Sequence, residues 1–255
     1  MFVDECHSTN SVLLEQRTEG LLWTDYQTAG RGQAGNGWES EKGKNILLSI
    51  GVKRPPIKPE EQWRMSMLFA LTVWEVVKTP PDPLSKGEKM NGEFSIKWPN
   101  DIYYGDCKIA GILIEHQLDS RGIAYSVLGV GINVNQTQWV GNAPNPTSLK
   151  RITGVEWDRE KIVDELWEKW QERWPLLADE EGLKKQYMAH LYRRDGRYPY
   201  VEREVSERPT MNASFGTEGQ FLASIEDVTP QGELVLRDAQ DTIRTYHFKQ
   251  IRFIL

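Results

Sequence analysis

The sequence predicts an α+β fold, in which a large domain of helices and strands is followed by a small all-β module. Strand-length apolar runs follow one another closely over residues 94–134, a spacing that favours antiparallel hairpins over repeated βαβ units. Two longer segments, 60–78 and 158–192, repeat apolar residues at helical spacing. The C-terminal part holds only short strand-like runs. We therefore expect an α+β domain at 1–192 and a small β-barrel-like domain at 193–255.

Each expected element follows from a local pattern of apolar residues. In chain order, the first domain is expected to hold a strand at 1–6, a helix capped by Ser8-Thr9-Asn10, strands at 21–24 and 45–52, a helix at 60–78, strands at 94–98, 107–117 and 124–134, and a helix at 158–192. The second is expected to hold strands at 200–205, 219–228, 233–237 and 242–248. The polar, glycine-rich stretch 27–45 predicts a long loop.

The composition bounds the class of protein. The chain has 255 residues, of which 39% are hydrophobic, which is enough for one large core and a small appendage. Lys and Arg number 31 against 37 Asp and Glu, giving a net charge of -6. Without a basic surplus, nucleic acid is not expected as a partner.

Cellular context follows from what the sequence does not carry. The N-terminal residues form no signal peptide, and no apolar run approaches the roughly 20 residues of a membrane span. Two isolated cysteines, Cys6 and Cys107, make neither a disulfide framework nor a metal site, and no pair of the four histidines has metal-ligand spacing. We expect a cytoplasmic protein without a resident metal or a membrane contact.

A glycine-rich segment at 30–35 fits the spacing G-x-G-x-x-G. The dinucleotide-binding fingerprint needs a helix directly after this segment, but further glycines and no helical apolar period follow it, so we reject that interpretation. What remains is a flexible loop with Arg31 and Trp38, whose backbone N–H groups can approach an anion closely. The alternative is a solvated surface loop.

Three more segments suggest a site, although each is weak alone. The segment 97–101 places a lysine, an amide and a carboxylate around a proline turn. Lys108 opens an apolar run, where a lysine is either a surface residue or a charge aimed into a site. The strand-like segment 129–135 carries two glycines, which permit close approach of a ligand or mark a bulge.

Taken together, these segments closely resemble the biotin–protein ligase family. The matching blocks, in order, are Ser8-Thr9-Asn10, residues 27–32 with Trp38, residues 97–101, residues 108–113 and residues 129–133. The resemblance covers nearly the whole chain. It implies a catalytic domain with a mixed β-sheet flanked by helices, followed by an SH3-like β-barrel domain.

The resemblance also implies the reaction and its participants. The carboxylate of biotin attacks the α-phosphorus of ATP, which carries Mg²⁺ on its phosphates, and gives biotinyl-5′-adenylate and pyrophosphate. A lysine of a biotin carboxyl carrier domain then displaces AMP. The ligase is expected to be a monomer or a homodimer.

The same resemblance assigns expected roles. Lys108, Arg31 and Asp101 are expected to be catalytic: Lys108 would serve both the carboxylate and the α-phosphate, and Asp101 would orient Lys108 or position or deprotonate the acceptor amine. The residues expected at biotin are Ser8, Thr9, Asn10, Gln27, Gly30, Arg31, Gln33, Trp38, Lys108, Gly111, Leu113 and Ile132. Those expected at the nucleotide are Lys97, Asn100, Lys108 and Asn133.

The chain departs from the family pattern in two respects. Many relatives carry a second arginine in the glycine loop where this chain has Gln33, which donates a hydrogen bond but carries no charge. Some relatives begin with a DNA-binding winged helix-turn-helix, whereas this sequence begins at the first catalytic strand. We therefore expect a ligase without a repressor role.

Two other functions fit parts of the pattern. A lipoate–protein ligase or lipoyl transferase shares the expected fold, but residues 97–101 and the glycine loop fit the biotin branch better. A transferase that uses a cysteine nucleophile would need an activated thiol, and neither cysteine has an obvious base beside it. A protein that only binds biotin would not need the anion-handling set of Arg31, Asp101 and Lys108.

Overall fold

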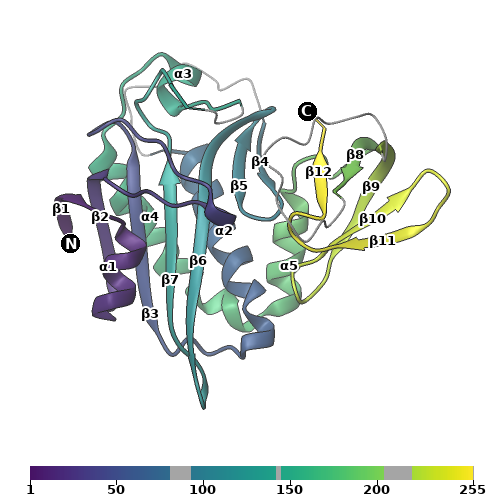
Figure 1. Cartoon of the computed structure of the whole chain (residues 1–255), viewed down its shortest axis with the longest axis horizontal. Coiled ribbons are helices and arrows are strands. Elements are labelled where there is room, and N and C mark those ends of the chain that lie inside the picture. The colour runs from purple at the N-terminus through teal and green to yellow at the C-terminus, as the bar shows by residue number, and fades with distance from the viewer. Residues whose placement is uncertain (81–92, 142–144, 204–219, 255) are drawn as a thin grey trace.

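The chain forms two β-sheets, with helices on both faces of the larger one (Figure 1). The computed structural model describes residues 1–80, 93–141, 145–203 and 220–254. The larger sheet has the strand order β1-β2-β3-β7-β6-β5-β4, and the smaller has the order β11-β10-β9-β8-β12. The elements of the first part are β1 (Phe2–Cys6), α1 (Thr9–Gln16), β2 (Gly20–Gln27), β3 (Ile46–Lys53), α2 (Trp63–Lys78), β4 (Phe94–Lys97), β5 (Asp101–Tyr104), β6 (Cys107–Asp119), β7 (Gly122–Ile132), α3 (Leu149–Thr153), α4 (Arg159–Arg173) and α5 (Glu180–Ala189). Those of the second are β8 (Tyr198–Glu202), β9 (Gln220–Val228), β10 (Leu234–Asp238), β11 (Ile243–Tyr246) and β12 (Ile251–Phe253).

The large sheet is mixed, as the sequence resemblance predicts. Strands β1 and β2 run parallel, whereas the β2–β3, β3–β7, β7–β6, β6–β5 and β5–β4 pairs are antiparallel. Helix α1 packs against β3 and β7 on one face, and α2 covers the other face with α4 and α5 behind it (Figure 1). The α+β class is thereby confirmed, and the small antiparallel sheet follows in the C-terminal part.

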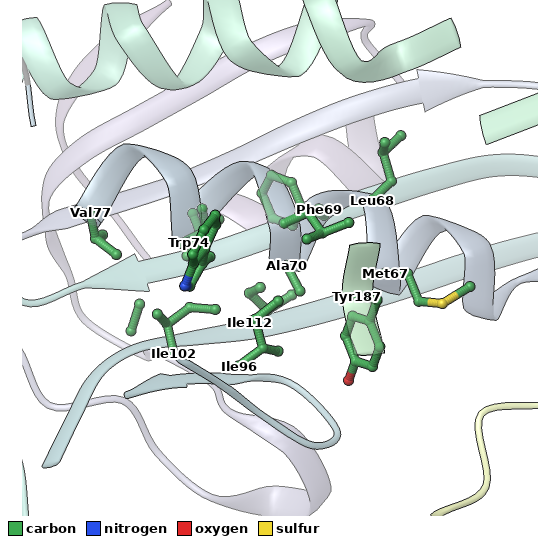
Figure 2. Close-up of a cluster of buried hydrophobic side chains, with 14 of the residues drawn as sticks. Met67, Leu68, Phe69, Ala70, Trp74, Val77, Ile96, Ile102, Ile112 and Tyr187 are labelled. Atoms are coloured by element: carbon green, nitrogen blue, oxygen red, sulfur yellow. The ribbon is translucent and has the colours of Figure 1, made fainter. Parts of the chain in front are cut away.

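Helix α2 forms the centre of the main core. Apolar side chains surround most of its circumference, which is typical of a helix buried between layers. Leu68 and Phe69 are fully buried, and the helix lies against Ile96, Ile102 and Ile112 of the sheet (Figure 2). This core leaves the opposite face of the sheet free to carry polar groups.

The segment 158–192, predicted as one helix, is two helices. Pro175 ends the first, because a proline has no N–H to continue the helical hydrogen bonds, and residues 174–178 form a 3₁₀ turn. Asp179 then caps α5 by accepting a hydrogen bond from Gly182 N at 2.9 Å.

Short elements escape sequence analysis. The strands β5 and β12 and the helix α3 were not predicted, since segments of three to five residues carry no apolar period. The predicted strand ends at 204–205 and 219 lie outside the described residues. The predicted N-cap is also wrong in detail: Ser8 stands at the N-cap of α1 but makes no side-chain cap hydrogen bond.

Membrane insertion through a helix finds no support in the described part of the chain. None of its helices combines the length and the apolar character that crossing a membrane requires.

Leu68→Ala tests the central position of α2. We expect a loss of about 2–5 kcal/mol in the free energy of unfolding, because a fully buried leucine leaves a cavity. Leu118→Ala is the matched control: Leu118 is 63% exposed at the end of β6, so its loss is expected within about 0.5 kcal/mol. Urea denaturation measures both, and equal losses would contradict the packing described.

Candidate active site

A cavity lies on the α1 face of the large sheet, under the glycine-rich loop. Three strands form its floor, the start of α1 forms one wall, and the loop at 31–38 forms its cover. The residues that line it are Ser8, Thr9, Asn10, Gln27, Arg31, Gly32, Gln33, Trp38, Leu47, Leu48, Asn100, Lys108, Gly111, Ile112, Leu113, Gly129, Val130 and Gly131. We call it the inner cavity. The loop continues into no helix beyond a 3₁₀ turn at Gln33–Gly35, which confirms the rejection of the dinucleotide fingerprint.

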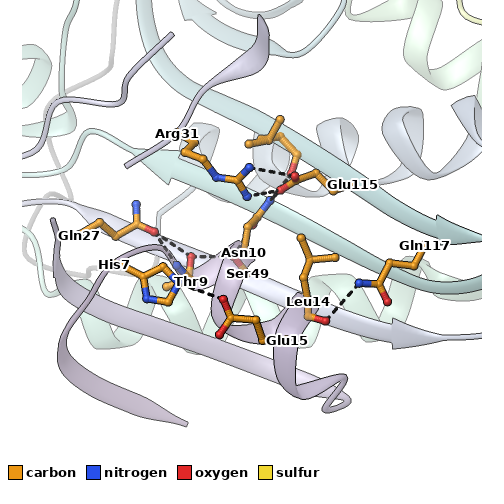
Figure 3. A network of polar contacts seen from close by, with 11 residues as sticks. His7, Thr9, Asn10, Leu14, Glu15, Gln27, Arg31, Ser49, Glu115 and Gln117 are labelled. Carbon is orange, nitrogen blue, oxygen red and sulfur yellow. Dashed lines mark hydrogen bonds and ion pairs between the residues drawn. The ribbon is translucent and has the colours of Figure 1, made fainter. Parts of the chain in front are cut away.

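One wall of the inner cavity is a chain of buried polar side chains (Figure 3). Gln27 Oε1 accepts hydrogen bonds from Thr9 N at 2.7 Å and Thr9 Oγ1 at 3.1 Å. The hydroxyl of Ser49 donates to Asn10 Oδ1 at 2.6 Å and lies 2.7 Å from Thr9 Oγ1. These side chains stabilise one another instead of capping α1. The Nε2 group of Gln27 has no acceptor among the described residues and is free to donate to a ligand.

The same chain of contacts reaches Arg31. Asn10 Nδ2 donates to Leu113 O at 3.1 Å and to Glu115 Oε2 at 2.8 Å. Arg31 donates to both oxygens of Glu115, at 3.1 and 2.8 Å (Figure 3). The guanidinium is therefore held at the cavity rim by a two-point ion pair, and Glu115 offsets its charge.

Glycines in the strands make room for Trp38. A Cβ atom at Gly131 would lie 2.3 Å from Trp38 Cε2, and one at Gly111 would lie 2.8 Å from Trp38 Cζ3. At Gly129 a Cβ atom would lie 2.1 Å from Asn10 Oδ1. The indole thus lies over β6 and β7, and a side chain at Gly111 or Gly131 would displace it.

Lys108 stands at the end of the inner cavity and is paired with Asp101. The two charged groups are 2.7 Å apart, with side chains 26% and 19% exposed. The pairing of β5 with β6 shifts register between Ile102 and Tyr103. Such a bulge re-aims side chains, and Lys108 Nζ lies 3.1 Å from where a Cβ of Gly111 would be. Lys108 Nζ also lies 5.5 Å from the centre of the Trp38 ring.

The turn before β5 is fixed to β6 by Asn100. The side-chain Nδ2 group of Asn100 donates to Ile112 O at 2.6 Å, and the backbone carbonyl of Asn100 accepts from Ile112 N at 2.9 Å. This two-way contact extends the β5–β6 ladder by one residue and brings Asp101 opposite Gly111.

A second, larger cavity adjoins the first where Trp38 and Lys108 line both. It lies between the loop, β5 and the C-terminal module, and we call it the outer cavity. Its lining residues are Asn36, Gly37, Trp38, Glu39, Lys97, Asp101, Tyr103, Lys108, Asn133, Trp139, Gly141, Pro146, Arg203, Arg252, Phe253 and Ile254. Four of these are cations, Lys97, Lys108, Arg203 and Arg252, against two carboxylates, so the cavity favours an anionic ligand.

Lys97 is a partly buried cation of the outer cavity. Burial lowers the pKa of Lys97 below its usual value; the charge of Asp101 opposes this shift, whereas those of Lys108 and Arg193 add to it. Lys97 Nζ donates to Tyr103 Oη at 3.1 Å and lies 5.2 Å from the ring of Phe253. A negative ligand beside it would restore favourable electrostatics.

Three polar atoms around the cavities are buried without a hydrogen-bond partner among the described residues. They are Gln33 Oε1, Trp38 Nε1 and Asn133 Oδ1. A buried polar atom without a partner is unfavourable, and clusters of such atoms mark places that a ligand or a loop movement satisfies. Within the described ranges no group of three or more His, Cys, Asp or Glu side chains could hold a metal ion.

Most of the residues expected from the sequence come together here. The inner cavity collects Ser8, Thr9, Asn10, Gln27, Arg31, Gln33, Trp38, Asn100, Lys108, Gly111 and Leu113, and the outer cavity collects Lys97, Asp101 and Asn133. Two expected residues do not line either cavity. Ile132 is fully buried in the main core, because it alternates with Gly131 across the sheet, and Gly30 lies at the base of the loop, where its carbonyl accepts from Trp38 N at 3.0 Å.

Sequence analysis missed several lining residues, and four side chains whose contacts order the site. Ser49 and Glu115 complete the polar chain of the inner cavity, and Tyr103 and Phe253 surround Lys97. Ser49 did carry a signal, since it is a hydroxyl in the middle of an apolar strand. Phe253 carried none, because its place depends on how the C-terminal module docks.

Comparisons with known proteins agree with this geometry. Residues 6–133 match the Biotin/lipoate A/B protein ligase family. The chain is 33% identical over 175 residues to the biotin–[acetyl-CoA-carboxylase] ligase of Mycobacterium tuberculosis, covering 64% of this chain and 59% of that protein. It is 30% identical over 175 residues to the bifunctional ligase/repressor BirA of Bacillus subtilis, covering 67% of this chain and 47% of that protein. The matches span about half the length of these curated relatives.

The fold is similar to that of a solved structure. The biotin protein ligase of Aquifex aeolicus in complex with biotin and ATP superposes with a TM-score of 0.74 at 21% identity, over 100% of this chain and 98% of that one. The family match covers residues 6–133, which is half of the 255 residues. The chain therefore belongs to the biotin/lipoate A/B protein ligase family.

Ser49→Ala tests the polar chain of the inner cavity. Removing the hydroxyl leaves Asn10 Oδ1 buried without its donor, so we expect a loss of about 1–3 kcal/mol in the free energy of unfolding. Ser66→Ala on α2 is the control, where the loss is expected within about 0.5 kcal/mol. Chemical denaturation measures the free energy of unfolding of both variants. If Ser49→Ala loses no more than Ser66→Ala, the hydrogen bonds of Ser49 to Thr9 and Asn10 do not hold α1 on the sheet.

Proposed function

We propose that the protein is an ATP-dependent biotin–protein ligase. Biotin would occupy the inner cavity and the nucleotide the outer one, with Lys108 between them. The carboxylate of biotin would attack the α-phosphorus, forming a C–O–P anhydride and releasing pyrophosphate. The amine of an acceptor lysine would then attack the carbonyl carbon, lose a proton and release AMP. The observation that carries the proposal is Lys108, which is paired with Asp101 and lines both cavities.

The charge of the reactants explains why a lysine stands at this junction. A carboxylate and a triphosphate repel one another, and negative charge accumulates at the α-phosphate as the new bond forms. A cation already in place stabilises that charge without reorganisation. Lys108 fits this need, and Asp101 holds it in position. Arg31 is the second expected cation, but Glu115 binds it at the rim, so we assign it to the cover of the inner cavity.

The polar wall of the inner cavity favours biotin over lipoate. The ureido ring of biotin has two donors and one acceptor, and burying it requires a partner for each. Thr9, Gln27 and Asn10 are hydrogen-bonding side chains on that wall, and Gln27 Nε2 is free to donate. The dithiolane ring of lipoate makes no use of them. Neither Cys6 nor Cys107 lines either cavity, which weighs against a transferase that uses a cysteine nucleophile.

The glycine-rich loop would protect the adenylate from water. Trp38 lies over β6 and β7, and its indole N–H has no partner among the described residues. A ligand that supplies that partner would hold the loop over the inner cavity, and water exclusion would prevent hydrolysis of the anhydride. Gln33 stands where many relatives have an arginine, and it contributes no charge to this cover.

The remaining participants follow from the reaction. Mg²⁺ would arrive on the phosphates of ATP, since oxygen ligands of a nucleotide suit it. The acceptor would be a biotin carboxyl carrier domain. A cytoplasmic location, a monomeric or homodimeric state, the absence of a repressor role and the domain division at 192/193 stay predictions.

Lys108→Ala tests the proposal directly. We expect the wild type to release AMP only with biotin, ATP and a carrier domain, and the variant to lose at least about 100-fold in adenylate formation, because the preorganised cation is gone. Lys169→Ala is the matched control, since Lys169 has a side chain 26% exposed, like that of Lys108, and forms a 2.8 Å pair with Glu172 on α4, away from both cavities. Its turnover is expected to match the wild type.

Two results would overturn the proposal. If the wild type is inactive with biotin but active with lipoate or octanoate, the substrate is wrong and the fold assignment stands. If Lys108→Ala and Lys169→Ala turn over biotin equally, Lys108 has no part in the chemistry.

A further inference from the structure

One of the contacts between the C-terminal module and the first part of the chain is a turn held between two tryptophans. The turn, Thr229–Gly232, joins β9 to β10. The carbonyl of Gly232 accepts a hydrogen bond from Trp98 Nε1 at 2.9 Å, across 134 residues of sequence. Trp98 is 4% exposed, so this is an interior contact between the two parts of the chain.

Trp63 closes the other side of the turn. A Cβ atom on Gly232 would lie 2.6 Å from Trp63 Cδ2, and the φ angle of Gly232 is +88°. Both facts require glycine, because any side chain there would clash with the indole and strain the backbone. Phe248 adds an edge contact to the Trp98 ring, at 6.4 Å between centroids. The turn is therefore seated in one position.

Trp98 continues directly into the residues that hold Lys108. Two residues later, Asn100 makes its two-way contact with Ile112 of β6. The next residue, Asp101, binds Lys108 at 2.7 Å. A short series of contacts thus connects the Gly232 carbonyl to the Lys108 amine. It consists of the hydrogen bond from Trp98, the four-residue turn 98–101, and the ion pair between Asp101 and Lys108.

We propose that Trp98 is a positioning residue, through which the docked C-terminal module holds the 98–101 turn and thereby sets Asp101 and Lys108. The inference rests on the proposed function for its catalytic consequence, but its structural part does not. Docking of the module fixes one end of the turn, and pairing with β6 fixes the other. The module then braces the active site from outside the catalytic sheet, whatever else it contacts.

Trp98→Phe tests this with little change of shape. Phenylalanine keeps an aromatic ring in the core and removes the indole N–H, so the Gly232 carbonyl loses its donor. Trp74→Phe is the matched control, because Trp74 Nε1 donates to Phe94 O at the same 2.9 Å inside the catalytic core. Both variants lose one indole N–H···O=C hydrogen bond, but only the bond of Trp98 connects the C-terminal module to the first part of the chain.

The first readout needs no substrate. Hydrogen exchange of the Ile112 amide reports the Asn100 contact directly, because that N–H donates to Asn100 O. We expect exchange at Ile112 to be about tenfold faster in Trp98→Phe, the size expected for the loss of one hydrogen bond, and unchanged in Trp74→Phe. Equal exchange rates in the two variants would overturn the proposal.

The second readout is a double-mutant cycle on biotin adenylate formation. If Trp98 acts through Asp101, Trp98→Phe slows the reaction about tenfold in the wild-type background and less than about twofold in Asp101→Asn, because contacts in one chain are not additive. The same fold loss in both backgrounds would show that Trp98 acts independently of Asp101 and overturn the proposal. If the wild type shows no biotin-dependent turnover but Ile112 exchanges faster in Trp98→Phe, the ligase function is refuted. The structural claim, that the Trp98–Gly232 contact holds the 98–101 turn, is then still supported.

Discussion

The ion pair between Lys108 and Asp101 is the contact on which the arrangement of the site depends. In the proposed reaction Lys108 would bridge two anionic ligands, and a carboxylate 2.7 Å away would stabilise its charge before either ligand arrives. The pair in turn needs the register shift between β5 and β6, and the turn that Asn100 joins to Ile112. Removing one partner of such a pair leaves an uncompensated charge, so the strands, the turn and the charges form one unit.

The second constraint is space above the sheet. Gly111 and Gly131 lie side by side in paired strands, and together they let an indole approach the backbone. Trp38 therefore covers a surface that is otherwise open, while α1 supplies the polar wall beside it. The main core sits on the opposite face under α2 (Figure 2), so the stability of the fold and the chemistry of the site use different faces of one sheet.

Most of the residues expected from the sequence lie in the candidate site, because they fall in short blocks whose order is characteristic. The blocks containing Gln27, Lys97 and Lys108 come from separate strands, and folding brings them to two adjoining cavities. What the sequence could not supply was the pairing between blocks. Glu115 as the partner of Arg31, and Trp98 as the partner of Gly232, depend on register and on docking. Neither leaves a trace in local composition. The α+β class could be predicted from the spacing of apolar residues. The short strands could not, because they depend on pairing with neighbouring strands, and the break between α4 and α5 depends on the single residue Pro175.

In the proposed reaction, Lys108 would join a biotin carboxylate in the inner cavity to a nucleotide in the outer one. The most direct measurement is exchange of labelled pyrophosphate into ATP with biotin, compared with exchange when biotinamide replaces it. Biotinamide keeps the ureido ring and the chain but has no carboxylate to attack the α-phosphorus. The proposed reaction predicts exchange with biotin and none with biotinamide. Exchange that proceeds without any biotin, or equally well with the amide, would contradict it.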